Sequence, residues 1–109
     1  MTDAKENIRN QDRMSSNDHP ASWTFLTNHT QVLICIAQDV DTTLRDVALK
    51  VGITERAAQR IVADLVEAQI IDRRRIGRRN HYHVNREAAM RHAAQADRQI
   101  GPLLDLLQP

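Results

Sequence analysis

Apolar residues recur at helical spacing from Thr27 to about Gln38, and this pattern predicts a first helix over that segment. Thr27 carries a hydroxyl group that can cap the helix. Cys35 lies in the same run and is the only cysteine of the chain, so we interpret it as a small buried residue rather than a nucleophile. The predicted apolar face contains Val32, Leu33, Ile36 and Ala37.

A second, shorter helix is expected from Arg45 to Val51. Thr43 and Asp46 have the spacing of a capping box, in which each side chain binds a backbone amide near the other. Gly52 then ends the helix, because glycine adopts the left-handed conformation of a helix terminus without steric cost.

A third helix is predicted from Glu55 to about Ala68, with Thr54 as its cap. Beyond it the pattern becomes that of two strands, over residues 70–76 and 81–84. These strands flank a turn over residues 77–80, which contains the Gly and Asn that hairpins favour. The apolar stripe of the third helix consists of Ala58, Ile61, Val62, Leu65 and Val66.

The two ends of the chain differ from its central part. Residues 1–22 contain few apolar residues and no period, so we interpret them as a disordered tail outside the fold. Residues 23–85 form the predicted folded domain. Asn85 can cap a final helical segment over 86–109, although Gly101-Pro102 is expected to break or kink it.

Composition narrows the class of protein. The 109 residues suit one domain, and with one Trp, one Tyr and one Phe the core must be aliphatic. The net charge is only +1, but five of the nine basic residues of 23–85 fall between Arg73 and Arg79. The chain has no apolar run of membrane-spanning length, no signal-peptide pattern and no possible internal disulfide, so we expect a cytoplasmic protein with no membrane partner.

The run from Leu44 to Ala63, LRDVALKVGITERAAQRIVA, resembles the helix-turn-helix signature. The matching positions are the pair Val47-Ala48, the turn Val51-Gly52-Ile53 and the buried Ile61. With the basic hairpin added, residues 24–85 resemble the winged helix-turn-helix transcriptional regulators, in particular small MarR-like and ArsR-like proteins. The resemblance implies an α+β, mainly helical fold with a three-helix core, a β-hairpin wing and a C-terminal helix.

Two residues depart from the pattern of this family. Ala58 stands where a bulkier β-branched residue is usual, which thins the core at that point. Gln69 stands where a glycine commonly ends the recognition helix, so the connection to the hairpin is expected to be strained. Neither residue lies on the face that would meet DNA.

The resemblance implies a sequence-selective, DNA-binding transcriptional regulator whose third helix reads the major groove. Arg56, Gln59 and Arg60 lie at helical spacing opposite the apolar stripe. Arginine can bind guanine and glutamine can bind adenine in that groove, and the amides near Thr54 suit a phosphate. The alternative is an ordinary solvated face, but the position directly after the glycine turn favours DNA contact.

The hairpin is expected to form a basic wing. In its second strand Tyr82 shares a face with Val84, and His81 shares the other with His83, whereas the faces of the first strand stay open. Arginine suits phosphates and narrow minor grooves, and five arginines opposed only by Asp72 exceed what keeps an exposed hairpin soluble. The expected wing contacts are Arg73, Arg74, Arg75, Arg78, Arg79, Asn80 and His81.

Other functions receive less support from the sequence. No nucleophile elbow or phosphate-binding glycine loop is present, so we predict neither an enzyme nor a cofactor. His81 and His83 could share a metal ion, but no thiolate pair accompanies them, and we predict no metal site. Two alternatives remain, namely a winged-helix module that binds protein and a metal-responsive repressor.

The C-terminal segment can pack on its own domain or against a second chain. A small domain offers little area to cover so many leucines, and helix-turn-helix proteins gain affinity by binding two half-sites. We therefore favour a homodimer on double-stranded DNA. Its expected interface contains Met90, Ile100, Leu103, Leu104, Leu106 and Leu107.

Overall fold

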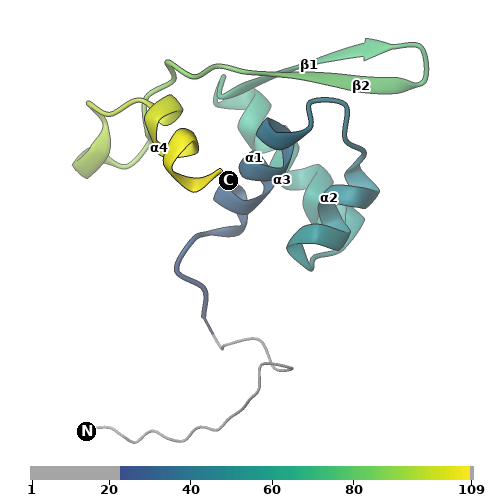
Figure 1. The fold of residues 1–109 in the computed structure, drawn as a ribbon, viewed down its shortest axis with the longest axis horizontal. Coiled ribbons are helices and arrows are strands. Elements are labelled where there is room, and N and C mark those ends of the chain that lie inside the picture. The colour runs from purple at the N-terminus through teal and green to yellow at the C-terminus, as the bar shows by residue number, and fades with distance from the viewer. Residues whose placement is uncertain (1–22, 109) are drawn as a thin grey trace, which may run out of the picture.

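The computed structural model describes residues 23–108, which form an α+β fold of four α-helices and one antiparallel hairpin (Figure 1). The tail predicted over residues 1–22 lies outside the described part of the chain. The three predicted helices are confirmed as α1 (Asn28–Gln38), α2 (Leu44–Val51) and α3 (Glu55–Glu67). They are followed by β1 (Ile71–Ile76), β2 (Arg79–Val84), a short 3-10 helix η1 (Ala93–Gln95) and α4 (Ile100–Leu107).

Threonine hydroxyl groups begin the helices at the predicted positions. Thr27 accepts a hydrogen bond from the Thr30 amide at 3.2 Å, and Thr43 accepts one from the Asp46 amide at 3.1 Å. The capping box of α2 is half formed, because among the described residues the Asp46 carboxylate returns no bond to Thr43. Gly52 ends α2 in the left-handed conformation, at φ +84°.

One aliphatic core joins α1, α2 and α3 to the base of the hairpin and to α4. Tyr82 is the aromatic residue of this core and is only 2% exposed. Cys35 also belongs to it, and burial raises the pKa of its thiol, although the charge of Lys50 acts in the opposite direction. The buried residues are Val32, Leu33, Cys35, Ile36, Val47, Ala48, Ala58, Ile61, Val62, Leu65, Ile70, Ile71, Tyr82, Ile100 and Leu104.

Gln69 connects α3 to β1 in a left-handed conformation, with φ +62°. No other non-glycine residue of the described chain has a positive φ. The Gln69 amide donates to the Val66 carbonyl at 3.0 Å, and the Ile70 amide donates to the Leu65 carbonyl at 2.9 Å, so the helix ends in a Schellman motif. The predicted strain at this position is confirmed, because a side chain in this conformation costs about 1–2 kcal/mol.

The hairpin turn is shorter than the sequence predicted. Ile76 pairs with Arg79, so only Gly77 and Arg78 lie in the turn, and the predicted start of the second strand at His81 is wrong by two residues. Gly77 has φ +61°, whereas Arg78 has no positive φ, which fits a type II′ turn. A glycine at the first turn position therefore lets the strands pair right up to the tip.

The prediction of a helix that begins at Arg86 is wrong, because no α-helix lies between β2 and α4. Asn85 caps no helix and instead accepts a 3.3 Å hydrogen bond from the Glu87 amide. The chain then folds back on itself, and the Met90 amide donates to the Arg98 carbonyl at 3.0 Å. Most side chains from 85 to 99 are exposed, so this stretch has no apolar stripe that could bury a helix against the domain.

Gly101 and Pro102 lie inside the first turn of α4 instead of breaking a helix. A proline is tolerated there because the first amides of a helix have no intrahelical partner. The Gly101 amide donates to the Arg86 carbonyl at 2.8 Å, and a Cβ atom on Gly101 would lie 2.9 Å from that same oxygen. Arg86 in turn donates to the Gly101 carbonyl at 3.1 Å and pairs with Asp105 at 2.7 Å.

Two residues assigned to a dimer interface by the sequence analysis lie in the core of their own chain. Ile100 is 5% exposed and Leu104 is 1% exposed. Because α4 packs against α1 through this side, these two side chains cannot also face a partner, and that part of the prediction is wrong. Met90, Leu103 and Leu107 are half-buried.

Candidate nucleic-acid interface

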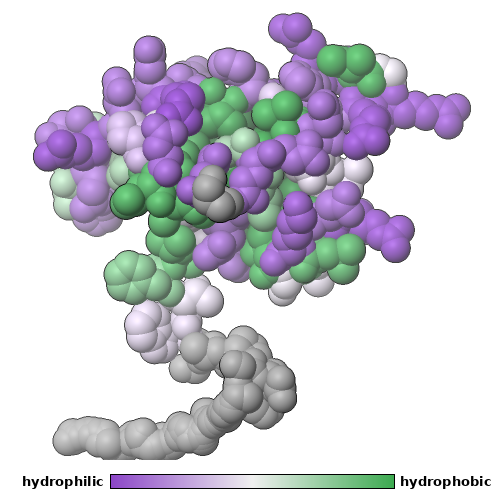
Figure 2. All heavy atoms as spheres, in the orientation of Figure 1, coloured by the Kyte–Doolittle hydropathy of each residue, from purple (hydrophilic) through white to green (hydrophobic). Residues whose placement is uncertain are grey.

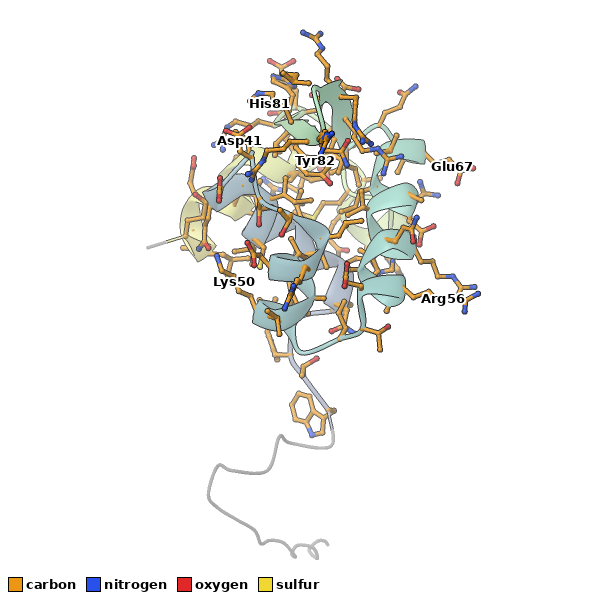
Figure 3. All side chains as sticks on the ribbon, turned by 90° about the vertical axis from the view of Figure 1, so that its right-hand side faces the viewer. Asp41, Lys50, Arg56, Glu67, His81 and Tyr82 are labelled. Atoms are coloured by element: carbon orange, nitrogen blue, oxygen red, sulfur yellow. The ribbon has the colours of Figure 1, made fainter. Side chains whose placement is uncertain are left out.

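The N-terminal half of α3 presents a polar face to solvent. Thr54 caps the helix by accepting a 3.0 Å hydrogen bond from the Ala57 amide. Arg56, Gln59 and Arg60 are all exposed, on the side of the helix opposite its core residues. Figure 3 shows Arg56 projecting from α3 away from the other helices. The predicted exposure of these three side chains is confirmed.

Acidic residues mark the other half of the same helix face. Asp64 and Glu67 are exposed, and Figure 3 shows Glu67 at the end of α3 nearest the hairpin. His29 of α1 lies 2.9 Å from Asp64. A surface suited to a polyanion therefore extends along α3 only as far as about Arg60, a boundary that the sequence analysis did not draw.

The strand register shows which side chains of β1 lie on each face of the hairpin, which the sequence left undecided. Ile71 opposes Val84 and Arg73 opposes Tyr82, so these residues share the face that packs on the core at the hairpin base. Arg75 with Asn80 continues the same face. The opposite face carries Asp72, Arg74, Ile76, Arg79, His81 and His83.

Loop residues between α1 and α2 hold the hairpin in place. The Arg79 guanidinium donates a 2.6 Å hydrogen bond to the Asp41 carbonyl oxygen, and His81 Nδ1 lies 2.8 Å from Asp41 Oδ1. The Tyr82 amide donates to the Val40 carbonyl at 2.9 Å. Figure 3 shows Asp41 and His81 side by side above α2. Arg79 and His81 were predicted as DNA contacts, but in this structure both also anchor the hairpin.

The remaining arginines of the hairpin differ in whether their side chains form hydrogen bonds within the described chain. Arg75 donates through Nε to the Gly77 carbonyl at 3.2 Å and so folds back over the turn. Arg73, Arg74 and Arg78 are exposed and make no hydrogen bond or ion pair to other described residues. These three guanidinium groups are the ones available to bind an external anion.

A groove of about 200 Å³ separates the hairpin from the helices. Arg78, Arg79, Asn80 and Tyr82 line one side of it. The other side is formed by residues 42–45 at the start of α2 and by Glu55 at the start of α3. Arg45 adds a positive charge to this side of the groove, and Glu55 adds a negative charge. Predicted contact residues of the hairpin thus line this groove, whereas the predicted contacts on α3, Arg56, Gln59 and Arg60, do not.

Asp41 is a residue of this region that the sequence analysis did not assign to the site. It lies in the turn between α1 and α2, where its amide donates to the Asp39 carboxylate at 3.1 Å. The contacts with Arg79 and His81 join residues about 40 positions apart, and no local pattern in one sequence signals such a pairing.

The described residues give little support to metal binding or to membrane insertion. Within residues 23–108, no group of three or more His, Cys, Asp or Glu side chains is arranged to hold a metal ion. His81 binds Asp41, and His83 is exposed opposite Asp72. No helix in this part of the chain combines the length and the apolar character needed to cross a membrane.

Comparison of the chain with protein-family models, with curated proteins and with solved structures finds no match in any of the three.

Proposed function

We propose that this chain is a winged helix-turn-helix protein that binds double-stranded DNA sequence-selectively and regulates transcription. The observation that carries the proposal is the exposed set Arg56, Gln59 and Arg60 on the N-terminal half of α3, in a domain that also carries an arginine-rich hairpin. A helix that enters the major groove contacts base edges from its N-terminal turns. Residues suited to that contact therefore stand where such a helix would use them.

The two contact regions would have different roles. Arg56 and Arg60 can each bind a guanine through two hydrogen bonds, and Gln59 can bind an adenine in the same way. Arg73, Arg74 and Arg78 of the hairpin would bind phosphates or enter the minor groove, which adds affinity with little base selectivity. The acidic half of α3, with Asp64 and Glu67, would lie outside the contact.

Charge favours DNA over an ordinary solvated surface. The hairpin has five arginines against Asp72, and Arg45 lines the groove that faces the hairpin. The release of counterions from DNA favours binding by such clusters of positive charge. An exposed hairpin needs only a few charges to resist aggregation. Two acidic side chains lie close to the hairpin, because Asp41 contacts His81 and Glu55 lines the groove, but the five arginines of the hairpin outnumber them.

Selection from a pool of random duplex DNA with the purified full chain tests the proposal. We expect enrichment of one motif, and binding to that motif should fall steeply as salt rises. Enrichment of no motif, together with salt-insensitive or absent binding, would contradict it. That outcome would favour a winged-helix module that binds protein.

A further inference from the structure

Ile76 is an exposed apolar side chain at the outer end of the hairpin. It is 57% exposed, although it pairs with Arg79 at the last position of β1. Figure 1 shows the hairpin extending past α2, so that its turn lies at the edge of the molecule. Figure 2 shows hydrophobic atoms near this end of the hairpin, with hydrophilic side chains around them. One exposed isoleucine is ordinary on a protein surface, so its surroundings decide what it indicates.

These surroundings are strongly positive. All five arginines of the hairpin lie within three sequence positions of Ile76, whereas the nearest acidic residue in the sequence, Asp72, is four positions away at the hairpin base. Threonine would give a strand the same β-branched shape without exposing apolar surface. An apolar side chain at the centre of a cationic cluster suits a partner in which anionic groups flank an apolar interior. Double-stranded DNA has this arrangement, with phosphates on either side of its stacked bases.

The end of the hairpin is also held in a defined conformation. The strands pair up to Ile76 and Arg79, and Arg79 donates a 2.6 Å hydrogen bond to the Asp41 carbonyl. Arg75 Nε donates to the Gly77 carbonyl at 3.2 Å, which ties the turn to β1. The β-branched Ile76 side chain itself has few rotamers to lose on binding. A side chain that separates stacked bases needs such support, because unstacking costs free energy.

We infer that Ile76 is an apolar wedge that enters between two stacked base pairs from the minor groove, at a flexible pyrimidine–purine step such as TA. This inference rests on the proposed function, since the hairpin must lie on DNA. The arginines would bind the phosphates on both sides, while the inserted side chain kinks the duplex towards the major groove. Pyrimidine–purine steps unstack most easily, so Ile76 adds a sequence preference without a hydrogen bond to any base edge.

Unstacking can be measured with 2-aminopurine, an adenine analogue whose fluorescence rises when it leaves the base stack. The full chain is titrated onto two labelled duplexes of equal length, one of alternating T and A and one with an unbroken run of A on one strand. The first contains TA steps, whereas the second contains none and is stiff. At low salt, where binding requires no particular sequence, we expect a rise at saturation several-fold larger on the alternating duplex.

Three variants separate the wedge from the charges around it. Ile76→Thr keeps the β-branched shape and every charge, so the salt dependence of binding should stay unchanged while most of the fluorescence rise is lost. Ile76→Phe provides a larger wedge and should retain or increase the rise. Leu49→Gln is the control, because it removes an apolar side chain that is 72% exposed on α2, and it should retain the full rise.

The outcomes distinguish this inference from the function on which it rests. Binding to both duplexes without any fluorescence rise would overturn the wedge and leave DNA binding in place. A full rise with Ile76→Thr, or an equal loss with Leu49→Gln, would have the same meaning. Absence of binding to either duplex would overturn both proposals, and it would favour a protein as the partner of the hairpin.

Discussion

The Nδ1 atom of His81 lies 2.8 Å from the Oδ1 atom of Asp41, across 40 positions of the sequence. The backbone carbonyl of the same Asp41 accepts a 2.6 Å hydrogen bond from Arg79. Together with the bond from the Tyr82 amide to the Val40 carbonyl, these contacts fix the direction of the hairpin relative to the helices. A wing must keep such a direction if it and α3 are to reach one duplex.

Replacing Asp41 with Ala should loosen the hairpin while leaving the domain folded. Both side chains of the Asp41–His81 pair are about half exposed, so the loss of unfolding free energy should stay below ~1 kcal/mol. The Tyr82 amide should exchange its hydrogen faster, because its acceptor Val40 lies in the loosened loop. Unchanged exchange at Tyr82 would show that the loop does not hold the hairpin. Asp97→Ala, in an exposed loop, serves as the control.

Gln69→Gly should stabilise the protein by about 0.5–1 kcal/mol. Glycine removes the ~1–2 kcal/mol penalty of a side chain at φ +62°, and part of this gain is offset by the greater freedom of glycine in the unfolded chain. Chemical denaturation measures the change. Gln69→Ala keeps the Cβ atom and should give no such gain, so equal stabilisation by both variants would contradict the explanation.

The sequence was most informative where structure is local. Threonine caps, Gly52 and the apolar stripes predicted three helices, because each signal lies within one turn of the feature it specifies. Gln69 was also identified in advance, since a helix end of this kind favours glycine. The exposed face of α3 followed from periodicity alone.

Features that depend on contacts between distant residues were either not predicted or predicted wrongly. A helix was expected to begin at Arg86 and to break or kink at Gly101-Pro102. Instead the Ile100 amide binds the Ala88 carbonyl at 2.9 Å and Gly101 binds Arg86, so tertiary contacts decide where α4 begins. The faces of β1 depended on a two-residue turn that the spacing of its isoleucines did not reveal. The anchoring of Arg79 by Asp41 joins strand β2 to the loop between α1 and α2, and no periodicity in the sequence connects them.

Gly101→Ala should destabilise the domain by about 1–3 kcal/mol, the usual cost of inserting an atom into a packed site. The new Cβ atom would lie 2.9 Å from the Arg86 carbonyl oxygen, which is backbone and cannot move away freely. Thermal or chemical unfolding measures the loss. Gln99→Ala tests the neighbouring position, where the side chain makes no capping bond, and should be nearly neutral. A neutral Gly101→Ala would show that this contact relaxes easily.

Arg78→Ala and Arg74→Ala should each weaken binding to all DNA sequences alike. Both side chains are exposed and free of described partners, so each removes a phosphate contact and flattens the salt dependence by about 0.9 in log–log slope. Titrations at several salt concentrations measure the slope. Arg98→Ala, an exposed arginine away from the hairpin, should leave it unchanged. A slope that stays the same in the hairpin variants would exclude phosphate contacts there.

Gln59→Ala and Arg60→Ala should change which DNA is bound rather than how strongly all DNA is bound. Both side chains are exposed on α3, so their truncation should alter the unfolding free energy by less than ~0.5 kcal/mol. Losing one good base contact should cost ~1–3 kcal/mol of binding to the selected motif, with preference relaxed at one or two positions.

The contrast with the hairpin variants makes this last prediction specific. Non-specific DNA should bind the α3 variants almost as well as wild type, apart from the single charge lost in Arg60→Ala. Glu67→Ala lies on the same helix, exposed but in its acidic half, and should not alter the motif. If the variants and wild type select the same motif with equal preference, α3 does not read bases. The hairpin would then bind DNA without sequence selectivity, and regulation of specific sites would need a different surface.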